Sequence, residues 1–310
     1  MALKGLITGV SGFVGHHLAR LLIDHGWQIS GTDLVKTDLD IPFYQCDLID
    51  KEFLTKVVVR TSPDVIFHLG GLLKSQNPNR LINVHVLGTL TLLESIQATG
   101  LRPLIIVASS SSVYGGGLEK VQISETQQPN PITLYGLSKL FQEMTVTHYQ
   151  KMNEMKVNLV RMFNLVGPRL SGEMSLSAFA KQIAYSERLD QPGHILTGNL
   201  DSVRDFVDVR DAAHAYLLIA EQGRVGETYN VCSGQPIRVG ECLTHMINRS
   251  RMVIEIDEDP ALMQTKDIPF QIGNPMKLLD DTGWQASIPL TQSLDDLLDY
   301  WRNVINSVQE

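Results

Sequence analysis

The sequence predicts an α/β fold, a doubly wound parallel sheet of the Rossmann type with a smaller C-terminal lobe. Three observations support this prediction. Short apolar runs alternate with amphipathic stretches over the first 165 residues, a glycine turn follows the first run, and the pattern loosens after about Gly167. Near-continuous apolar strands that alternate with helices indicate a parallel sheet covered on both faces. Ligands of such sheets bind at the carboxyl ends of the strands.

The expected elements of the first part follow in order along the chain. The strands are Leu3–Thr8, Gln28–Thr32, Phe43–Cys46, Val65–Leu69, Leu104–Ser109 and Val157–Met162. The helices between them are Phe13–His25, Lys51–Arg60, Asn79–Thr99 and Leu134–Met152. We therefore expect a first domain over residues 1–166, to which about residues 204–232 return.

The second part of the chain has fewer regular patterns. We expect loops at 168–177 and 190–198, a helix over Ala212–Glu221, and little regular structure in Asn248–Pro275, where periodicity is weak. Apolar residues with helical spacing predict a last helix over Leu290–Val308. Residues 167–310 are expected to form mainly a substrate-binding lobe that closes over the edge of the sheet. A cleft between two lobes is the usual place for a small-molecule site.

Composition excludes several classes of function. The chain has 26 basic and 34 acidic residues, and this net charge of −8 disfavours general binding to nucleic acid or to an anionic membrane. Three cysteines, Cys46, Cys232 and Cys242, without C-x-x-C spacing argue against a disulfide framework and a zinc site. No apolar run approaches the roughly 18 residues that span a bilayer. We expect a cytoplasmic protein without a metal.

A glycine turn joins the first expected strand to the first expected helix. It reads Gly9-Val10-Ser11-Gly12-Phe13-Val14-Gly15, with the spacing G-x-x-G-x-x-G. Without side chains at the glycines, backbone N–H groups and a helix N-terminus can approach a pyrophosphate. The alternative is a turn that merely packs a helix on a strand.

An acidic residue at the end of the second strand favours the pyrophosphate interpretation. Asp33 lies 24 positions after Gly9, near the roughly 20 expected for the acid that binds the hydroxyls of an adenosine ribose. Its charge would repel a 2′-phosphate, which favours NAD(H), although Lys36 could approach such a phosphate and keeps NADP(H) open. The alternative is a turn residue after a strand.

Tyr135 and Lys139 form a Y-x-x-x-K pair, and the i, i+4 spacing puts both side chains on one face of a helix. A tyrosine titrates near pH 10, and a nearby ammonium lowers that value toward neutrality. An ordinary surface pair is the alternative. The context is a buried strand that runs into four serines, 109–112, at the carboxyl edge of the sheet, where a hydroxyl could bind a substrate oxygen.

Taken together, these motifs resemble the extended short-chain dehydrogenase/reductase family of nucleotide-sugar epimerases, dehydratases and reductases, also described as NAD-dependent epimerases/dehydratases. The resemblance covers nearly the whole chain. It includes TGVSGFVG, Asp33, Asp47-Leu48, HLGG at 68–71, SSSVYG, YGLSK, RMFNLVGP, VRDFVDVRD and YNVCSG.

The resemblance implies a nicotinamide dinucleotide cofactor, a nucleotide-diphosphate sugar as substrate, and a homodimer through helices such as Asn79–Thr99 and Leu134–Met152. It implies Ser110, Tyr135 and Lys139 as the catalytic set. Tyr135 and Lys139 are also expected to contact the cofactor, where Lys139 binds the nicotinamide ribose and tunes Tyr135. Further cofactor contacts are expected from Gly9, Gly12, Phe13, Val14, Gly15, Asp33, Asp47, Leu48, Leu69, Gly70 and Gly71. Substrate contacts are expected from Ser111, Asn164, Lys181 and Arg204.

The resemblance also bears on the reaction. Dehydratases of this kind place an acid two positions before the tyrosine of V-Y-G, where this chain has Ser112, a poor base, so dehydration is disfavoured. The second half is most similar to reductases of GDP-4-keto-6-deoxy-D-mannose. We therefore expect reduction of this sugar to GDP-D-rhamnose, with Tyr135 as proton donor. The alternatives are an NAD-dependent nucleotide-sugar 4-epimerase and a non-catalytic regulatory protein that binds the cofactor.

Three departures from the family pattern remain. His85 stands where the motif N-V-x-G-T has an amide, and a hydrogen-bonded scaffold role is favoured over proton transfer. Gln264 stands where a second diphosphate-binding arginine is expected. A bidentate phosphate donor is therefore lost, unless Lys266 or Arg169 takes the place of that arginine. Asp33 favours NAD(H), whereas many reductases of this type prefer NADPH, and this keeps the epimerase interpretation open.

Overall fold

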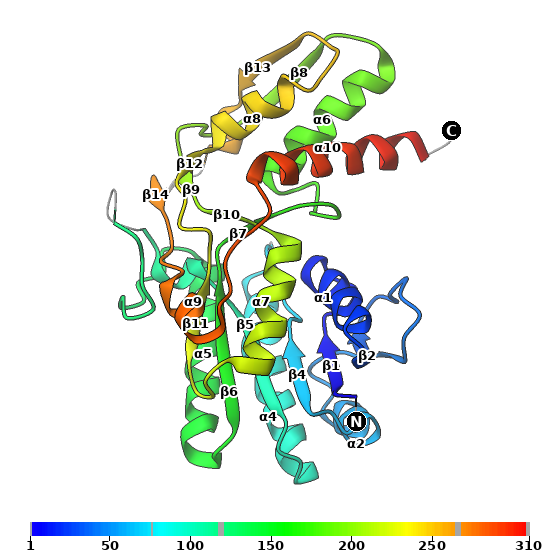
Figure 1. Cartoon of the computed structure of the whole chain (residues 1–310), viewed down its shortest axis with the longest axis vertical. Helices are drawn as coiled ribbons and strands as arrows, with labels where there is room; N and C mark the ends of the chain where they lie inside the picture. The colour runs from blue at the N-terminus through cyan, green and yellow to red at the C-terminus, as the bar shows by residue number, and fades with distance from the viewer. Residues whose placement is uncertain (1, 76, 117–120, 264–267, 308–310) are drawn as a thin grey trace.

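A computed structural model describes residues 2–75, 77–116, 121–263 and 268–307. It confirms the predicted doubly wound sheet: seven strands, all parallel, lie in the order β11-β6-β5-β4-β1-β2-β3 (Figure 1). The strands are β1 (Lys4–Thr8), β2 (Gln28–Asp33), β3 (Phe43–Gln45), β4 (Val65–His68), β5 (Leu104–Ser110), β6 (Lys156–Met162) and β11 (Thr228–Val231). The strand order reverses between β1 and β4, which is where ligands of such sheets bind.

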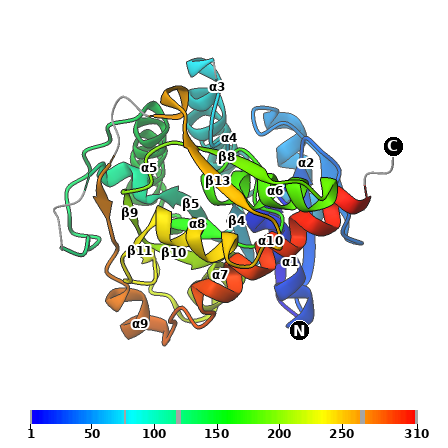
Figure 2. The same cartoon turned by 90° about the horizontal axis from the view of Figure 1, so that it is seen from above.

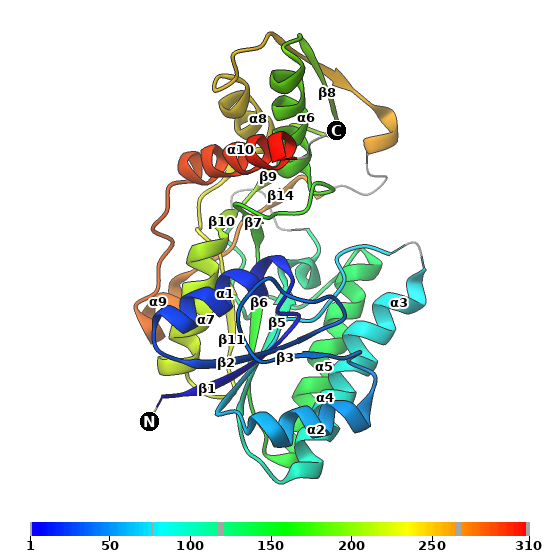
Figure 3. The same cartoon turned by 90° about the vertical axis from the view of Figure 1, so that its right-hand side faces the viewer.

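Helices cover both faces of this sheet (Figure 3). One face packs on α1 (Phe13–Asp24) and α7 (Val209–Gln222) through buried side chains such as Leu18 and Tyr216. The other face packs on α2 (Lys51–Thr61), α4 (Gly88–Thr99) and α5 (Leu134–Asn153). Because apolar side chains point to both faces, most strands read as near-continuous apolar runs, and this pattern predicted six of the seven to within one residue at each end. β11 was not predicted as a strand.

The helix expected over Asn79–Thr99 has three parts. It consists of α3 (Pro78–Ile82), a π-helical turn η1 (Asn83–Leu87) and α4, which follow one another without a break. By length and composition Pro78–Thr99 could cross a membrane, but 44% of its most apolar window is buried inside the protein. A core helix passes the same test, so this is weak evidence for a membrane span.

The second lobe lies beyond the carboxyl edge of the sheet, and Figure 2 looks down onto it. Its core lies between α6 (Ser175–Leu189), α8 (Val239–Ile247) and α10 (Leu290–Ser307). Two small sheets lie in this part of the chain. In one, β8 (Gly193–Thr197) pairs with β13 (Ile254–Glu258). In the other, β9 (Val203–Arg204) lies between β12 (Ile237–Arg238) and β14 (Phe270–Gln271). There are also short 3-10 turns, η2 (Ser111–Tyr114) directly after β5 and η3 (Pro260–Leu262) after β13.

Parts of the loop prediction for this lobe are wrong. β8 lies within the expected loop 190–198, and β13 and β14 lie within the segment Asn248–Pro275. β8 is only five residues long, and β13 is exposed at four of its five positions. The shortness of β8 and the exposure of β13 leave too little apolar alternation for either strand to be recognised from sequence.

The chain crosses between the two lobes several times. β7 (Asn164–Val166) pairs with β10 (Phe206–Asp208), after which α7 and β11 rejoin the sheet. A further return was not predicted: α9 (Met276–Thr282) and Trp284 also pack with the sheet domain. Trp284 is 1% exposed, and its Nε1 donates to the carbonyl of Asp211 at 2.9 Å.

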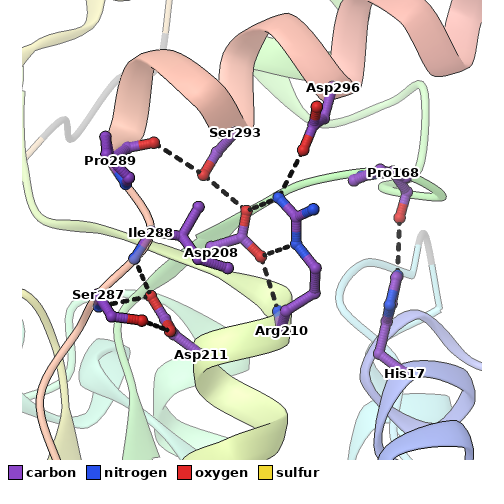
Figure 4. Close-up of polar contacts among 10 residues, drawn as sticks. All are labelled: His17, Pro168, Asp208, Arg210, Asp211, Ser287, Ile288, Pro289, Ser293 and Asp296. Atoms are coloured by element: carbon purple, nitrogen blue, oxygen red, sulfur yellow. Dashed lines mark hydrogen bonds and ion pairs between the residues drawn. The ribbon is translucent and has the colours of Figure 1, made fainter.

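Buried carboxylates at the start of α7 fix α10 to the sheet domain (Figure 4). Arg210 donates to both oxygens of Asp208, each at 2.8 Å, and to Asp296 of α10 at 2.6 Å. Ser293 of α10 donates to Asp208 at 2.6 Å. These hydrogen bonds hold the lobe over the edge of the sheet at which the predicted site residues lie.

Candidate active site

The glycine turn forms a cradle at the end of β1. Gly9 has φ +74°, and a Cβ there would lie 2.7 Å from the amide nitrogen of Gly70. A Cβ on Gly15 would meet the carbonyl of Gly9. Gly12 is the N-cap of α1 and makes no side-chain capping bond, so the N–H groups of the first turn are left for an anion. The cradle therefore fits the pyrophosphate of a dinucleotide.

Asp33 lies beside this cradle. Its Oδ2 accepts from the N–H of Ser11 at 3.0 Å, and its Oδ1 accepts from the N–H of Leu34 at 2.7 Å. The carboxylate thus ties the end of β2 to the glycine turn. Leu48 packs nearby, because a Cβ on Gly70 would lie 2.7 Å from its Cδ1, while Asp47 is exposed and accepts from the N–H of Ile49 at 3.2 Å.

Ser110 and Tyr135 meet at the carboxyl end of β5. Ser110 is the last residue of this strand, and Tyr135 lies in the first turn of α5, whose N-cap Thr133 accepts from the N–H of Gly136 at 3.0 Å. The side chain of Ser110 lies close enough to the phenol of Tyr135 to lower its pKa. Ser110 Oγ also lies 3.2 Å from Ser112 Oγ, to which it donates. Two of the three expected catalytic residues are therefore neighbours.

Burial raises the pKa of the Tyr135 phenol, and the hydrogen bond with Ser110 opposes this shift. The expected lowering of this pKa by Lys139 is therefore wrong for this structure. Lys139 is only 4% exposed, and its ammonium donates to the carbonyl of Ala108 at 2.9 Å and to Gln142 Oε1 at 3.0 Å. Burial lowers the pKa of Lys139 to about 8, while the charge of Glu143 opposes this shift.

A buried polar network supports the helix that carries Tyr135 and Lys139. Glu143 accepts from Ser109 Oγ at 2.5 Å and pairs with Arg161 of β6 at 2.7 Å. Arg161 donates to the hydroxyl of Tyr114 at 3.0 Å. The sequence analysis did not identify this network. A signal for it was Arg161, a charged residue inside a strand that is buried at every position but its first.

The expected substrate residues lie in different surroundings. Ser111 is buried, and its hydroxyl donates to Gln271 of β14 at 3.1 Å. Asn164 of β7 donates to the carbonyl of Asp205 at 3.0 Å, and Arg204 is the residue before Asp205. Asn164 and Arg204 therefore both lie where the chain crosses between the lobes. Lys181 is exposed on α6, and its ammonium lies 5.4 Å from the ring centre of Trp301 on α10.

The residues of the family departures are only partly described. Gln264 and Lys266 lie outside the described residues. Arg169 forms an ion pair with Asp38 at 3.0 Å, so its described partner is a carboxylate. Among residues 2–75, 77–116, 121–263 and 268–307, no group of three or more histidines, cysteines or acids is arranged to hold a metal.

The fold and this arrangement define the class of protein. A family model described as "NAD dependent epimerase/dehydratase family" matches residues 5–232, and the chain belongs to this family. It is an NAD(P)-dependent enzyme of the class that contains nucleotide-sugar reductases, epimerases and dehydratases. The predicted family, enzyme class and nicotinamide dinucleotide cofactor are thereby confirmed.

Particular relatives refine this picture. A GDP-6-deoxy-D-mannose reductase of Pseudomonas aeruginosa is 32% identical over 98% of each chain. A GDP-6-deoxy-D-talose 4-dehydrogenase of Aggregatibacter actinomycetemcomitans is 30% identical over 91% of this chain and 92% of its own. The solved structure titled "RMD from Pseudomonas aeruginosa complexed with NADPH" superimposes with a TM-score of 0.87 at 30% identity, over 97% of this chain and 99% of that one.

Proposed function

We propose that this enzyme reduces GDP-4-keto-6-deoxy-D-mannose to GDP-D-rhamnose. Two full-length relatives are named for GDP-linked 6-deoxy sugars, and the name of one specifies chemistry at position 4. The observation that carries the reaction type is the contact between Ser110 and Tyr135, with a phenol whose raised pKa keeps it protonated. A protonated phenol is suited to donate to an oxygen that gains negative charge.

The residues divide the work as follows. A nicotinamide cofactor held by the glycine cradle would supply the hydride for C4 of the keto sugar. Tyr135 donates its phenolic proton to the oxygen of C4, so that hydride and proton together give the new hydroxyl group. Ser110 donates a hydrogen bond that orients the carbonyl beforehand. General acid catalysis of this kind contributes about 10²–10⁴ in rate.

Ser112 supports reduction over dehydration. Its hydroxyl lies 3.2 Å from Ser110 Oγ, so it belongs to the same group of hydroxyls as the proposed catalytic pair. Dehydration needs a base that removes a proton from carbon, and a serine hydroxyl at neutral pH is a weak one. The hydroxyl position instead suits hydrogen bonding to a sugar.

Asp33 supports a preference for NADH over NADPH. Its carboxylate is held by two backbone N–H groups, those of Ser11 and Leu34, at the edge of the glycine cradle. A 2′-phosphate on the adenosine ribose would there meet a fixed negative charge. The solved relative at 30% identity contains NADPH, so the preference is proposed from this chain's own residue.

One experiment separates this proposal from its alternatives. The purified protein is mixed with NADH and GDP-4-keto-6-deoxy-D-mannose, and NADH absorbance and the sugar product are followed. One NADH consumed per GDP-D-rhamnose formed supports the reductase. Interconversion of 4-epimers without net NADH consumption would instead establish a 4-epimerase. Cofactor binding without turnover of any keto sugar would establish the regulatory role.

Exposed apolar side chains support a homodimer through α4 and α5. Leu87 beside α4 is 45% exposed, and Phe141 and Met144 on α5 are 39% and 59% exposed. Burial of such a patch against a second copy is favourable, at about 25 cal/mol per Å² of apolar surface. Light scattering during size-exclusion chromatography tests this, and a monomeric mass would exclude it.

The cysteines support location of the protein in the reducing cytoplasm, because all three are free thiols. Cell fractionation tests this location.

A further inference from the structure

The π-helical turn η1 carries a buried histidine into the candidate active site. His85 is 0% exposed, whereas Leu87 of the same turn is 45% exposed. π-helical turns are rare, and they occur frequently at functional sites because the extra residue changes which side chains point inward. This turn puts the His85 ring between the loop after β4 and the first turns of α5.

Hydrogen bonds fix the protonation state of the His85 ring. Nε2 accepts from the N–H of Leu72 at 3.1 Å, so Nε2 carries no proton. Nδ1 therefore carries the proton of the neutral ring and donates to Ser138 Oγ at 2.8 Å. Ser138 Oγ in turn donates to the carbonyl of Tyr135 at 2.8 Å. One imidazole thus joins the loop after β4 to the backbone of the proposed proton donor.

Packing leaves little freedom around this ring. The rings of His85 and Tyr135 meet edge to face, with centres 5.6 Å apart and planes at 76°. A Cβ on Gly71, a predicted cofactor contact, would lie 3.1 Å from Nε2. Burial and the charge of Lys139 lower the pKa of His85 to about 3, with a further contribution from His68. A ring that stays neutral is unsuited to proton transfer near neutral pH.

The backbone of His85 reaches Lys139 by a second route. The hydroxyl of Thr89 donates to the carbonyl of His85 at 2.6 Å and accepts from Gln142 Nε2 at 2.8 Å. Gln142 Oε1 accepts from the ammonium of Lys139 at 3.0 Å. His68 Nε2 also donates to Thr89, at 2.9 Å. The turn is therefore coupled to Tyr135 through its side chain and to Lys139 through its backbone.

We propose that His85 is a positioning residue, which fixes the loop Gly70–Leu72 relative to Tyr135 through its neutral Nδ1–H tautomer. Its two ring nitrogens have separate roles. Nε2 positions the loop Gly70–Leu72, which contains the predicted cofactor contacts Gly70 and Gly71. Nδ1 positions the first turn of α5, which carries the Tyr135 phenol. The effect on turnover rests on the proposed reduction, whereas the effect on cofactor binding does not.

Two variants separate the two nitrogens. In His85→Asn the amide has a polar group near the position of Nδ1, so it retains the bond to Ser138 and loses the bond to Leu72. In His85→Gln the amide reaches the position of Nε2, so it retains the bond to Leu72 and loses the bond to Ser138. His148→Asn, at an exposed site on α5, is the matched control.

The readouts are the Kd for NADH from fluorescence titration and kcat with the keto sugar. We expect His85→Asn to raise the Kd about three- to tenfold with kcat nearly unchanged, and His85→Gln to lower kcat by about the same factor with the Kd nearly unchanged, as expected for one hydrogen bond. A residue that only stabilises the fold would change both quantities together in both variants. Parallel changes, or no change in either variant, would overturn the proposal.

Two further measurements need no turnover, and the first needs no variant. Nitrogen NMR of the wild-type protein reports the tautomer, and a protonated Nε2 on His85 would overturn the assignment. If no keto sugar is turned over, the phenol of Tyr135 can be titrated by ultraviolet absorbance instead. A Tyr135 titration that moves in His85→Gln and stays in His85→Asn supports the positioning role even where the proposed reaction fails.

Discussion

The carboxylate of Glu143 lies 2.7 Å from the guanidinium of Arg161, and both side chains are buried, at 6% and 8% exposure. Glu143 follows Lys139 by one helical turn on α5, and Arg161 lies on β6. The pair therefore holds the helix with the proposed catalytic residues against the sheet.

We expect Arg161→Met to destabilise the protein by about 3–5 kcal/mol, because it leaves a carboxylate buried without its partner. The double variant Arg161→Met, Glu143→Leu should recover a large part of this loss, since it removes both charges. Urea denaturation measures both. Lys56→Met, which breaks an exposed pair with Glu52, is the control and should change stability little. A single variant no worse than this control would contradict the role of the buried pair.

The same helix carries the central prediction about catalysis. Tyr135→Phe should lower kcat by about 10²–10⁴ while NADH binds as before, because the phenolic proton is lost and the ring is kept. Tyr185→Phe, which removes a hydroxyl from a ring that is 55% exposed on α6, is the matched control. Steady-state kinetics and NADH titration give the two quantities. Retained turnover in Tyr135→Phe would sink the proposed mechanism.

The sequence predicted six strands of the sheet and the glycine cradle, because each depends on local patterns. The pairing of Ser110 with Tyr135 came from the family resemblance. Apolar strands, missing side chains and strand ends are visible in short windows of residues. The pKa of Tyr135 was predicted in the wrong direction, since burial and the partners of Lys139 depend on the tertiary fold. The return of Trp284 to the sheet domain and the pairing of Glu143 with Arg161 also join segments far apart in sequence.

Two buried histidines predict a loss of stability in acid. Burial lowers the pKa of His68 and of His85 to about 3, while an unfolded chain protonates its histidines near 6.5. Between these values the unfolded state binds more protons than the folded state, so stability falls as pH decreases from about 6.5 toward 3. Each histidine contributes a slope of up to about 1.4 kcal/mol per pH unit.

Urea denaturation at several pH values tests this slope. His85→Asn and His68→Asn should each reduce the change of unfolding free energy with pH by the contribution of one histidine, even where they lower stability at neutral pH. His214→Asn, at an exposed site on α7, is the matched control for the substitution itself. Equal slopes for all the proteins would show that neither histidine is held neutral by the fold.

Asp33 gives a prediction about cofactor choice. Asp33→Asn keeps an oxygen that can accept from a backbone N–H but removes the charge, so NADPH should gain on NADH by about tenfold or more in kcat/KM. Asp40→Asn, at an exposed position in the loop between β2 and β3, changes the net charge equally and should leave the cofactor preference unchanged. The comparison requires kcat/KM for both cofactors in each protein. Preference for NADPH in the wild-type protein would contradict the assignment of Asp33.

The buried ammonium of Lys139 predicts how activity depends on pH. Its pKa is lowered to about 8, so the side chain is charged below that pH and neutral above it. The pKa of Tyr135 is raised, so the phenol stays protonated through the same range. kcat/KM, which reports the free enzyme, should therefore fall as pH rises through about 8 because the ammonium is lost while the proton donor remains.

Substitution at Lys139 distinguishes this cause from others. Lys139→Arg keeps a charge to much higher pH, so the fall in kcat/KM should move upward or disappear from the range of about pH 7 to 9, whatever the absolute rate. Lys139→Met has no charge to lose and should give a low, flat profile. If all three proteins lose activity at the same pH, the group that titrates is not Lys139. A fall in kcat/KM that stays near pH 8 in Lys139→Arg but disappears in Tyr135→Phe would point to the Tyr135 phenol as the group that titrates. The pKa of that phenol would then have to be lower than its burial implies.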